Sequence, residues 1–234
     1  MFDQISKPSK IRFIFLIVIN VITYPLVINL VAGTWHWLEG WLFGLWFAAM
    51  VLSNFIYLYL RDPALLAERS RMSSGKKRKP WDVFFGLFAV LMALAWFLLI
   101  PLDAKRFSWS PPFPLWVKVM GGFFLLIALY LIYFSTAENT FLSAQVRIQS
   151  ERKQQVITTG VYGFVRHPYY LGILLMLLGA PLMTGSLVGL SIGLVAVIAL
   201  AIRILGEEKM MVDELEGYRE YMQKVKYRLL PFVW

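Results

Sequence analysis

The stretch YYLGILLMLLGAPLMTGSLVGLSIGLVAVIALAIRIL, residues 169–205, decides the fold. It is far longer than the roughly 20 apolar residues that one helix needs to cross a bilayer. Pro181 and the residues 184–186 interrupt it near its middle. The stretch therefore predicts a helical hairpin, with a first arm from Tyr169 to Met183 that is short for a complete crossing.

Four further apolar runs precede the hairpin, near residues 11–32, 40–60, 81–100 and 114–136. Each is long enough to cross a hydrocarbon layer of roughly 30 Å at about 1.5 Å per residue. We therefore expect an all-α, polytopic membrane protein with five or six transmembrane helices. Residues 1–136 supply a four-helix transmembrane region, and residues 137–234 supply a cytoplasmic segment, the hairpin and a C-terminal cap, all in one integrated domain.

The composition supports a membrane protein, since 59% of the 234 residues are hydrophobic and 16% are charged. A water-soluble globule of this size could not cover so much apolar side chain with polar surface. The formal net charge is +9, but Lys and Arg are confined between long apolar runs, which favours anionic membrane lipids over nucleic acid as partners. The sequence contains no cysteine, so it offers no disulfide and no thiolate.

The distribution of basic residues predicts the orientation in the membrane. Lys and Arg concentrate in the N-terminal segment, in residues 61–80, in residues 137–168 and after the hairpin. The opposite loops carry Lys105 and Arg106, with Lys118 close by. Because cytoplasmic segments are enriched in Lys and Arg, we expect both termini to be cytoplasmic. The basic run 76–79 is interpreted as part of this pattern, beside anionic lipid.

The polar residues of the last third fall into two blocks that flank the hairpin. The first block comprises Gly160, Tyr162, Arg166, His167, Pro168, Tyr170 and Gly172. The second comprises Arg203, Glu207, Glu208, Tyr218, Tyr221, Arg228 and Pro231. A hairpin returns the chain to the face from which it started, so we expect the two blocks to meet at the cytoplasmic face and form a site.

The first block has the features of an anion site. Pro168 suits the first turn of a helix, where it has no amide hydrogen to lose. Arg166 and His167 come directly before that helix start, where free N–H groups and the positive end of the helix dipole attract a carboxylate. No second histidine and no cysteine lies at metal-ligand spacing, so we expect no metal site.

In the second block, Arg203 and Glu207 are one helical turn apart on one face of a helix. An unpaired charge at this depth costs several kcal/mol by order of magnitude, so we expect the two to pair with each other or with a ligand, while Glu208 points elsewhere. The alternative is that these residues only mark the membrane border, with Arg203 extended toward water and both glutamates solvated.

Taken together, the two blocks resemble the small integral-membrane methyltransferases that include isoprenylcysteine carboxyl methyltransferase and phospholipid N-methyltransferases. The resemblance covers residues 139–234, and the order and spacing of its parts agree although each short motif is unspecific alone. Its parts are Gly160-x-Tyr162, Arg166-His167-Pro168-x-Tyr170-x-Gly172, the hairpin, Arg203, Glu207-Glu208, Tyr218-x-x-Tyr221 and Arg228-x-x-Pro231.

The resemblance implies an enzyme that binds S-adenosylmethionine in a cytoplasm-facing pocket and methylates a lipophilic or small-molecule acceptor. The residues that it assigns to the cofactor are Tyr162, Arg166, His167, Tyr170, Gly172, Glu207 and Glu208. It assigns catalytic roles to Arg203 and Glu207. Arg203 would orient a carboxylate acceptor such as a prenylcysteine-like group, and Glu207 or Glu208 would accept a proton if the acceptor were an amine.

The N-terminal part adds an expectation about location. Residues 32–35, 65–69 and 146–149 resemble a bacterial branch of the same family, which implies the bacterial cytoplasmic membrane. Glu138 and Asn139, at the end of the fourth run, are interpreted as helix-end caps and left outside the site.

Two other functions are weighed against methyl transfer. Membrane reductases related to steroid 5-alpha-reductase look similar at the C-terminus and use NADPH, but their pattern has an Arg-Asp pair and a Lys-Cys pair where this chain has Glu207-Glu208 and no cysteine. A non-enzymatic carrier or assembly subunit would need a polar path through the helices, and the first four runs offer few ionisable residues for one.

Overall fold

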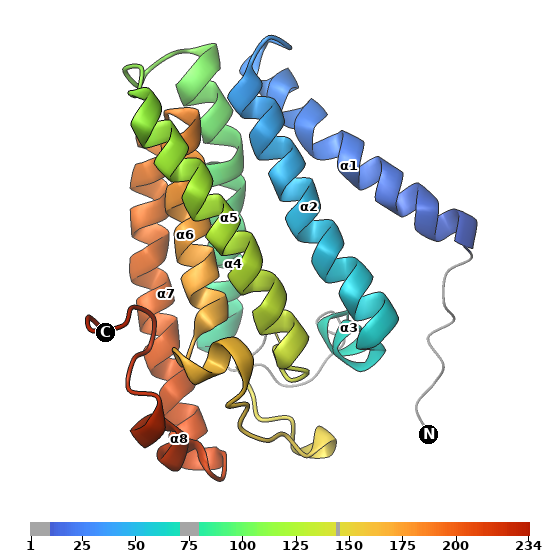
Figure 1. The fold of residues 1–234 in the computed structure, drawn as a ribbon, viewed down its shortest axis with the longest axis vertical. Coiled ribbons are helices and arrows are strands. Elements are labelled where there is room, and N and C mark those ends of the chain that lie inside the picture. The colour runs from blue at the N-terminus through green and yellow to red at the C-terminus, as the bar shows by residue number, and fades with distance from the viewer. Residues whose placement is uncertain (1–9, 71–79, 144–145) are drawn as a thin grey trace.

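The computed structural model describes residues 10–70, 80–143 and 146–234, and within these ranges the chain forms helices and no β-strand. Its long helices lie side by side in a bundle, with α1 leaning away from the others at one end (Figure 1). These are α1 (Lys10–Ala32), α2 (Leu38–Arg61), α4 (Pro80–Pro101), α5 (Leu115–Glu138), α6 (Pro168–Thr184) and α7 (Leu187–Glu214). The short elements are α3 (Pro63–Ser70), the π-helical turn η2 (Leu102–Arg106), the 3-10 turns η3 (Ser150–Arg152) and η4 (Gly160–Gly163), and α8 (Tyr218–Lys224).

The predicted fold class is confirmed, because α1, α2, α4 and α5 coincide with the four apolar runs and α6 and α7 form the hairpin. Within the described ranges, four helices are long and apolar enough to cross a membrane: Leu38–Arg61, Val83–Arg106, Leu115–Glu138 and Leu187–Glu214. Ile17–Ala32 and Pro168–Thr184 are shorter apolar helices. The chain is therefore polytopic, and the number of five or six crossings stays a prediction. The basic run 76–79 lies outside the described residues.

The hairpin turns at the predicted place, with a left-handed Gly185 (φ 87°) and Ser186 capping α7 by accepting from the Gly189 N–H at 2.8 Å. Pro181, however, does not interrupt the first arm, because α6 continues through it to Thr184. A proline inside a helix leaves the carbonyl four residues earlier without its N–H partner. Here that carbonyl, on Leu177, accepts from the Trp96 indole N–H at 3.3 Å.

The second arm is also longer than the apolar run, because α7 continues past residue 205 to Glu214. At about 1.5 Å per residue, its 28 residues span roughly 42 Å, more than a hydrocarbon layer requires. The last turns of α7 therefore extend beyond the bundle and carry the acidic residues of the second block with them (Figure 1).

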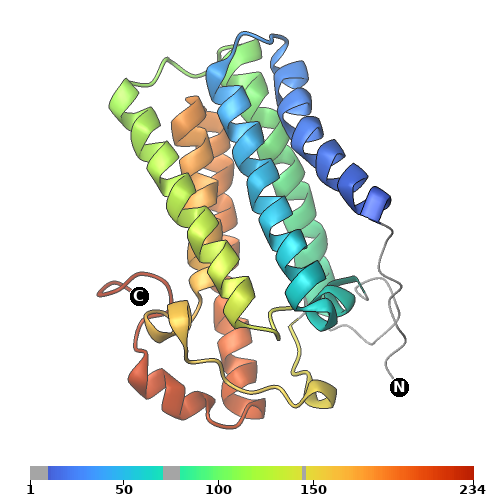
Figure 2. The same cartoon turned by 45° about the vertical axis from the view of Figure 1, so that its right-hand side comes forward.

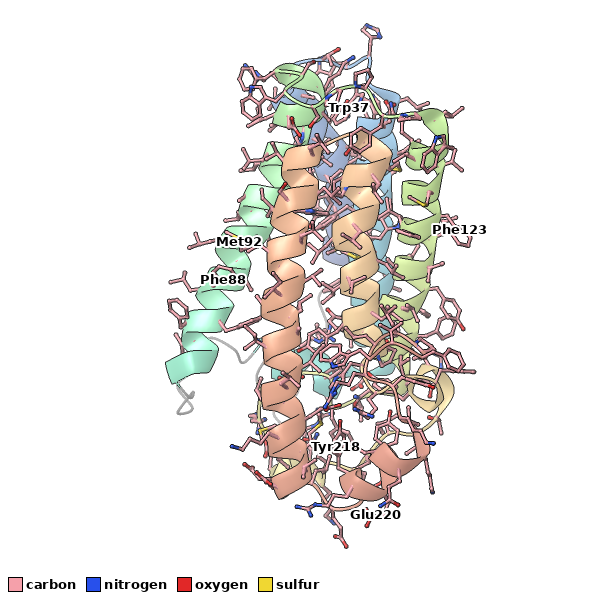
Figure 3. All side chains as sticks on the ribbon, turned by 90° about the vertical axis from the view of Figure 1, so that its left-hand side faces the viewer. Trp37, Phe88, Met92, Phe123, Tyr218 and Glu220 are labelled. Atoms are coloured by element: carbon pink, nitrogen blue, oxygen red, sulfur yellow. The ribbon has the colours of Figure 1, made fainter. Side chains whose placement is uncertain are left out.

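Close packing of α5 against α6 holds the first arm of the hairpin near both of its ends. A Cβ on Gly121 would lie 2.4 Å from the Met183 nitrogen, and a Cβ on Gly172 would lie 2.7 Å from Ile132 Cγ1. Only glycine permits the two helices to approach this closely. The outer surface is apolar instead: Phe123 on α5 points away from the bundle, as expected of a side chain that faces lipid (Figure 3).

At one end of the bundle, buried Asp103 in η2 joins the hairpin turn to the end of α4. Its Oδ2 accepts from Ser110 Oγ at 2.7 Å, from Ser186 Oγ at 2.6 Å and from the Val188 N–H at 3.0 Å. The opposite end carries α3, residues 146–167 and α8, and we call it the cap end (Figures 1 and 2). Both polar blocks lie at the cap end.

Candidate active site at the cap end

Glu208 of α7 is the centre of one polar cluster. Its side chain is only 5% exposed, and it accepts from Arg166 Nε at 2.6 Å and from Arg228 Nε at 2.7 Å. His167 Nε2 lies 3.2 Å from the same carboxylate. A buried carboxylate without partners costs several kcal/mol by order of magnitude, so the two arginines and the histidine around Glu208 are what permit its burial. The two predicted blocks therefore meet, and the anion beside the start of α6 is a side chain of the protein itself.

The C-terminal segment holds the residues before α6 in place through its backbone. The N–H groups of Arg166 and His167 donate to the carbonyls of Tyr227 and Arg228, each at 2.9 Å. Arg166 Nη1 also donates to the carbonyls of Val225 and Lys226, at 2.8 Å and 2.7 Å. Together with the contact of Arg166 with Glu208, these bonds join three segments that are far apart in the sequence: residues 166–167, the end of α7 and residues 225–228.

Glu207 belongs to a second cluster, which faces α6. The hydroxyl of Tyr170 donates to Glu207 Oε1 at 2.5 Å, and Arg203 Nε donates to the same oxygen at 2.9 Å and to the Tyr170 hydroxyl oxygen at 3.0 Å. Arg203 is 8% exposed, and its guanidinium lies 4.7 Å from the ring centre of Phe85. This arrangement is the predicted pairing of Arg203 with Glu207 and not an arginine extended toward water.

A cavity of about 120 Å³ opens beside these two clusters. Its walls come from the end of α5, from residues 141–143 and 146–157, from residues 162–170, from the end of α7 and from α8. Apolar Met210, Met211 and Leu215 form one part of the wall, whereas Arg147 and Glu207 add charge. A pocket with apolar walls and a few convergent polar groups is typical of a small-molecule site.

Five of the residues assigned to a cofactor line this cavity: Tyr162, Arg166, His167, Tyr170 and Glu207. The other predicted site residues lie behind these five. Glu208 binds Arg166 and His167 from outside the wall. Arg203 contacts Tyr170 and Glu207, and Gly172 packs against α5. These three therefore position the residues that face the cavity.

Tyrosine hydroxyls connect the cap to the bundle at this cavity. Tyr221 donates to the carbonyl of Tyr162 at 2.7 Å, and the Tyr162 hydroxyl donates to the carbonyl of Ser135 at 3.2 Å. Tyr218, the first residue of α8 (Figure 3), is 3% exposed, and its buried hydroxyl has no hydrogen-bond partner in the described part of the chain. Burial raises the pKa of the Tyr218 phenol, so this hydroxyl is a protonated donor at neutral pH.

Several residues of the cavity wall were left out of the predicted site, and Asn139 and Tyr218 are two of them. Asn139 is the C-cap residue of α5, with its backbone N–H donating to the Ser135 carbonyl. Its side-chain Oδ1 accepts from the Phe141 N–H at 2.9 Å, and its Nδ2 lies 3.3 Å from the Tyr162 hydroxyl. The signal for Asn139 was its position directly after a span on the predicted cytoplasmic side. Tyr218 was part of the family motif, but nothing in the sequence indicates that its hydroxyl has no partner.

The donor set of the cavity consists of phenol, amide, imidazole and guanidinium groups, with Glu207 as a carboxylate. Across residues 10–70, 80–143 and 146–234, no group of three His, Asp or Glu side chains is placed to hold a metal ion.

The fold and the site together define a class: polytopic helical membrane proteins with a small-molecule cavity at one end of the bundle. The sequence model of the phospholipid methyltransferase family matches residues 116–217, from the start of α5 to the residue before α8. Residues 116–217 are therefore similar to the phospholipid methyltransferase family, which is the family that the motifs resemble.

A relative from Saccharomyces cerevisiae, a protein-S-isoprenylcysteine O-methyltransferase, is 32% identical to this chain over 150 residues. The aligned part is 62% of this chain and 61% of the yeast protein. The chain thus spans about three fifths of the length of this curated relative.

Proposed function

We propose that this protein is an integral-membrane methyltransferase that uses S-adenosylmethionine and methylates a lipophilic acceptor at the cytoplasmic face of the membrane. The observation that carries the proposal is the position of the cavity, between a polar cap and an apolar bundle. The family similarity and the yeast relative support the same reaction class.

An apolar groove supports a lipophilic acceptor. It encloses about 370 Å³ between α2, α5 and α6, and Tyr169 forms part of its wall and of the cavity wall. Leu58, Ile173 and Met176 are among its lining residues. These residues belong to apolar helices, so the hydrocarbon chain of an acceptor would lie in the groove with its reactive end at Tyr169.

The residues of the cavity fit the proposed cofactor. S-adenosylmethionine supplies an electrophilic methyl group on a positively charged sulfonium. The rings of Tyr162 and Tyr170 and the carboxylate of Glu207 favour a bound cation. The hydroxyl of Tyr218, which has no partner among the described residues, offers a hydrogen bond to a polar group of the ligand.

The proposed chemistry is direct transfer, in which the chain mainly binds, orients and excludes water. Bringing two reactants together in this way contributes about 7–11 kcal/mol. Arg203 holds Tyr170 and Glu207 in their positions, so we assign it a positioning role. We favour a carboxylate acceptor of the prenylcysteine type, which needs no general base.

If the acceptor is an amine, Glu207 is the base that the geometry favours. It lines the cavity, whereas Glu208 is occupied by Arg166, His167 and Arg228. Proton transfer requires the base to be within hydrogen-bond reach of the reacting group, and of the two glutamates Glu207 is the one that lines the cavity where this group would bind.

We also propose a bacterial cytoplasmic membrane, with the cap end and both termini in the cytoplasm. What supports this orientation is the charge of the cap end, which carries Arg61, Lys153, Lys209 and Lys224 on its surface, while basic residues at the opposite end are few.

The test is calorimetric titration of the purified protein with S-adenosylhomocysteine. We expect saturable binding that is lost in Glu207→Ala and His167→Ala and kept in Glu214→Ala, an exposed residue at the end of the same helix. Binding of NADPH in place of S-adenosylhomocysteine would instead support the membrane reductase. If the folded protein binds neither, both enzyme proposals fail and a carrier becomes the better hypothesis.

A further inference from the structure

Residues 225–234 run from the end of α8 back toward the bundle and close into a loop. The N–H groups of Arg228 and Leu229 donate to the carbonyl of Trp234 at 2.9 Å and 3.0 Å. Leu229 is buried under the loop, and the Arg228 guanidinium lies 5.3 Å from the ring centre of Trp234. The loop is therefore a defined structure, joined at Arg228 to the polar cluster.

The tip of this loop is apolar and exposed. Phe232 is 89% exposed and Val233 is 76% exposed, and Pro231 beside them is also exposed. Phe232 has a left-handed backbone (φ 66°), which a bulky residue rarely adopts. The backbone thus turns two large apolar side chains outward. The Phe232 ring lies 5.3 Å from the Tyr227 ring between centroids, and this contact leaves most of the Phe232 side chain exposed.

Along the axis of the bundle, the loop lies at the level where the apolar helices end on the side of the cap end. The chain end marked C lies beside the bundle at the level where α2 and α5 end (Figures 1 and 2). Glu220 on α8 lies at the far tip of the cap (Figure 3). Because the backbone of residues 227–228 pairs with residues 166–167, directly before α6, the loop is held at the level where that apolar helix begins.

The charge of the segment fits an anionic surface. Lys224, Lys226 and Arg228 precede the apolar tip, and no acidic residue follows Glu220. Basic residues followed by exposed aromatic and aliphatic side chains are typical of segments that enter the headgroup layer of a membrane.

We propose that the tip formed by Phe232 and Val233 inserts into the interfacial layer of the bilayer on the side of the cap end. The occupant of this apolar surface is lipid, continuous with the lipid around the helices. The insertion holds residues 225–228 against Arg166 and His167 and so supports the polar cluster from outside. The proposal does not depend on which reaction the protein performs.

The absence of cysteine from the sequence permits a direct test with single labelled sites. Val233→Cys and Glu220→Cys are each labelled with an environment-sensitive fluorophore in nanodiscs of phosphatidylcholine and phosphatidylglycerol. We expect the label at 233 to be quenched by a spin label near the lipid headgroup and protected from aqueous iodide by roughly fivefold relative to the label at 220.

Two results would overturn the proposal. Equal iodide quenching at 233 and 220 would place the tip in water. Protection from iodide without quenching by the lipid spin label would place another protein surface, such as a second copy of the chain, over the tip. Circular dichroism of both labelled variants verifies that the fold is intact.

Discussion

Arg166 Nε lies 2.6 Å from Glu208 Oε1, although 42 positions separate the two residues in the sequence. The contact closes the α6–α7 hairpin at the cap end. Replacing Glu208 by glutamine removes the negative charge between buried Arg166 and its neighbours, and we expect a loss of about 3–5 kcal/mol in the free energy of unfolding. Thermal unfolding of the purified variant and of the parent protein measures this loss in the free energy of unfolding.

The matched control is Glu214→Gln, which changes an exposed carboxylate on the same helix and should cost less than about 0.5 kcal/mol. Similar losses in the two variants would mean that the cluster around Glu208 does not stabilise the fold.

Arg203 and Glu207 should be energetically coupled, because Arg203 Nε contacts Glu207 Oε1 at 2.9 Å where both side chains are largely buried. Each of Arg203→Met and Glu207→Met leaves one charge without its partner, whereas the double variant removes both. A double-mutant cycle on unfolding free energy should give a coupling of about 1–3 kcal/mol. Additive losses would contradict the pairing.

Tyr218 and Tyr221 should respond differently to loss of the hydroxyl. Tyr218→Phe removes a buried hydroxyl that has no partner among the described residues, so the melting temperature of the ligand-free protein should not fall. The affinity of the variant for S-adenosylhomocysteine should fall by roughly tenfold, because the ligand loses one hydrogen bond that contributes about 1.5 kcal/mol.

Tyr221→Phe is the comparison, since that hydroxyl donates to the Tyr162 carbonyl at 2.7 Å. This variant should lose about 1 kcal/mol of stability. An unchanged affinity in Tyr218→Phe, with the cofactor still bound by the parent protein, would show that the Tyr218 hydroxyl does not contact the ligand.

The groove between α2, α5 and α6 should control the lipophilic acceptor and not the cofactor. Met176→Trp fills this groove and should raise KM for the acceptor by roughly tenfold, while affinity for S-adenosylhomocysteine changes by less than about twofold. Leu126→Trp, at an exposed position on α5, is the control. Equal effects of the two substitutions on KM would argue against the groove as the acceptor site.

Alkaline pH should destabilise the fold through Tyr162. Burial raises the pKa of its phenol above the value of about 10 in an unfolded chain. Below about pH 10 the phenol is neutral in both the folded and the unfolded state, so its contribution to the free energy of unfolding is fully present. Above that pH the unfolded state releases the proton first, so stability falls as pH rises toward the folded pKa.

Melting temperatures measured from about pH 8 to about pH 11 test this expectation. The decline should be steeper in the parent protein than in Tyr162→Phe, which cannot ionise at this position. Parallel declines would assign the alkaline effect to other groups, such as lysine.

The sequence predicted the helices well because a lipid environment imposes a simple length and composition rule on each crossing. It failed where the rule does not apply. Pro181 remains inside α6 because the Trp96 indole, from another helix, takes the place of the missing backbone donor. The extension of α7 to Glu214 is polar, and hydropathy does not detect it.

For the site, motif spacing predicted that Arg166, His167 and Glu207 would be near each other, because a hairpin brings the start of its first arm close to the end of its second arm. It could not predict the contact of Arg228 with Glu208 at 2.7 Å. That contact depends on how the C-terminal segment returns from α8, which is decided by backbone pairing with residues 166–167. That the Tyr218 hydroxyl has no partner in the part of the chain that the structure describes is likewise a property of three-dimensional packing alone.

The contact between Arg166 and Glu208 depends on how the two arms of the α6–α7 hairpin are placed in the membrane. Arg166 comes before the first arm and Glu208 follows the apolar part of the second, so a hairpin whose two arms both cross the bilayer brings them to the same face. A nascent chain that left one arm out would strand these charges on opposite faces of the membrane, and neither would find its partner. The Arg166–Glu208 ion pair therefore favours the topology in which both ends of the hairpin lie on one face of the membrane.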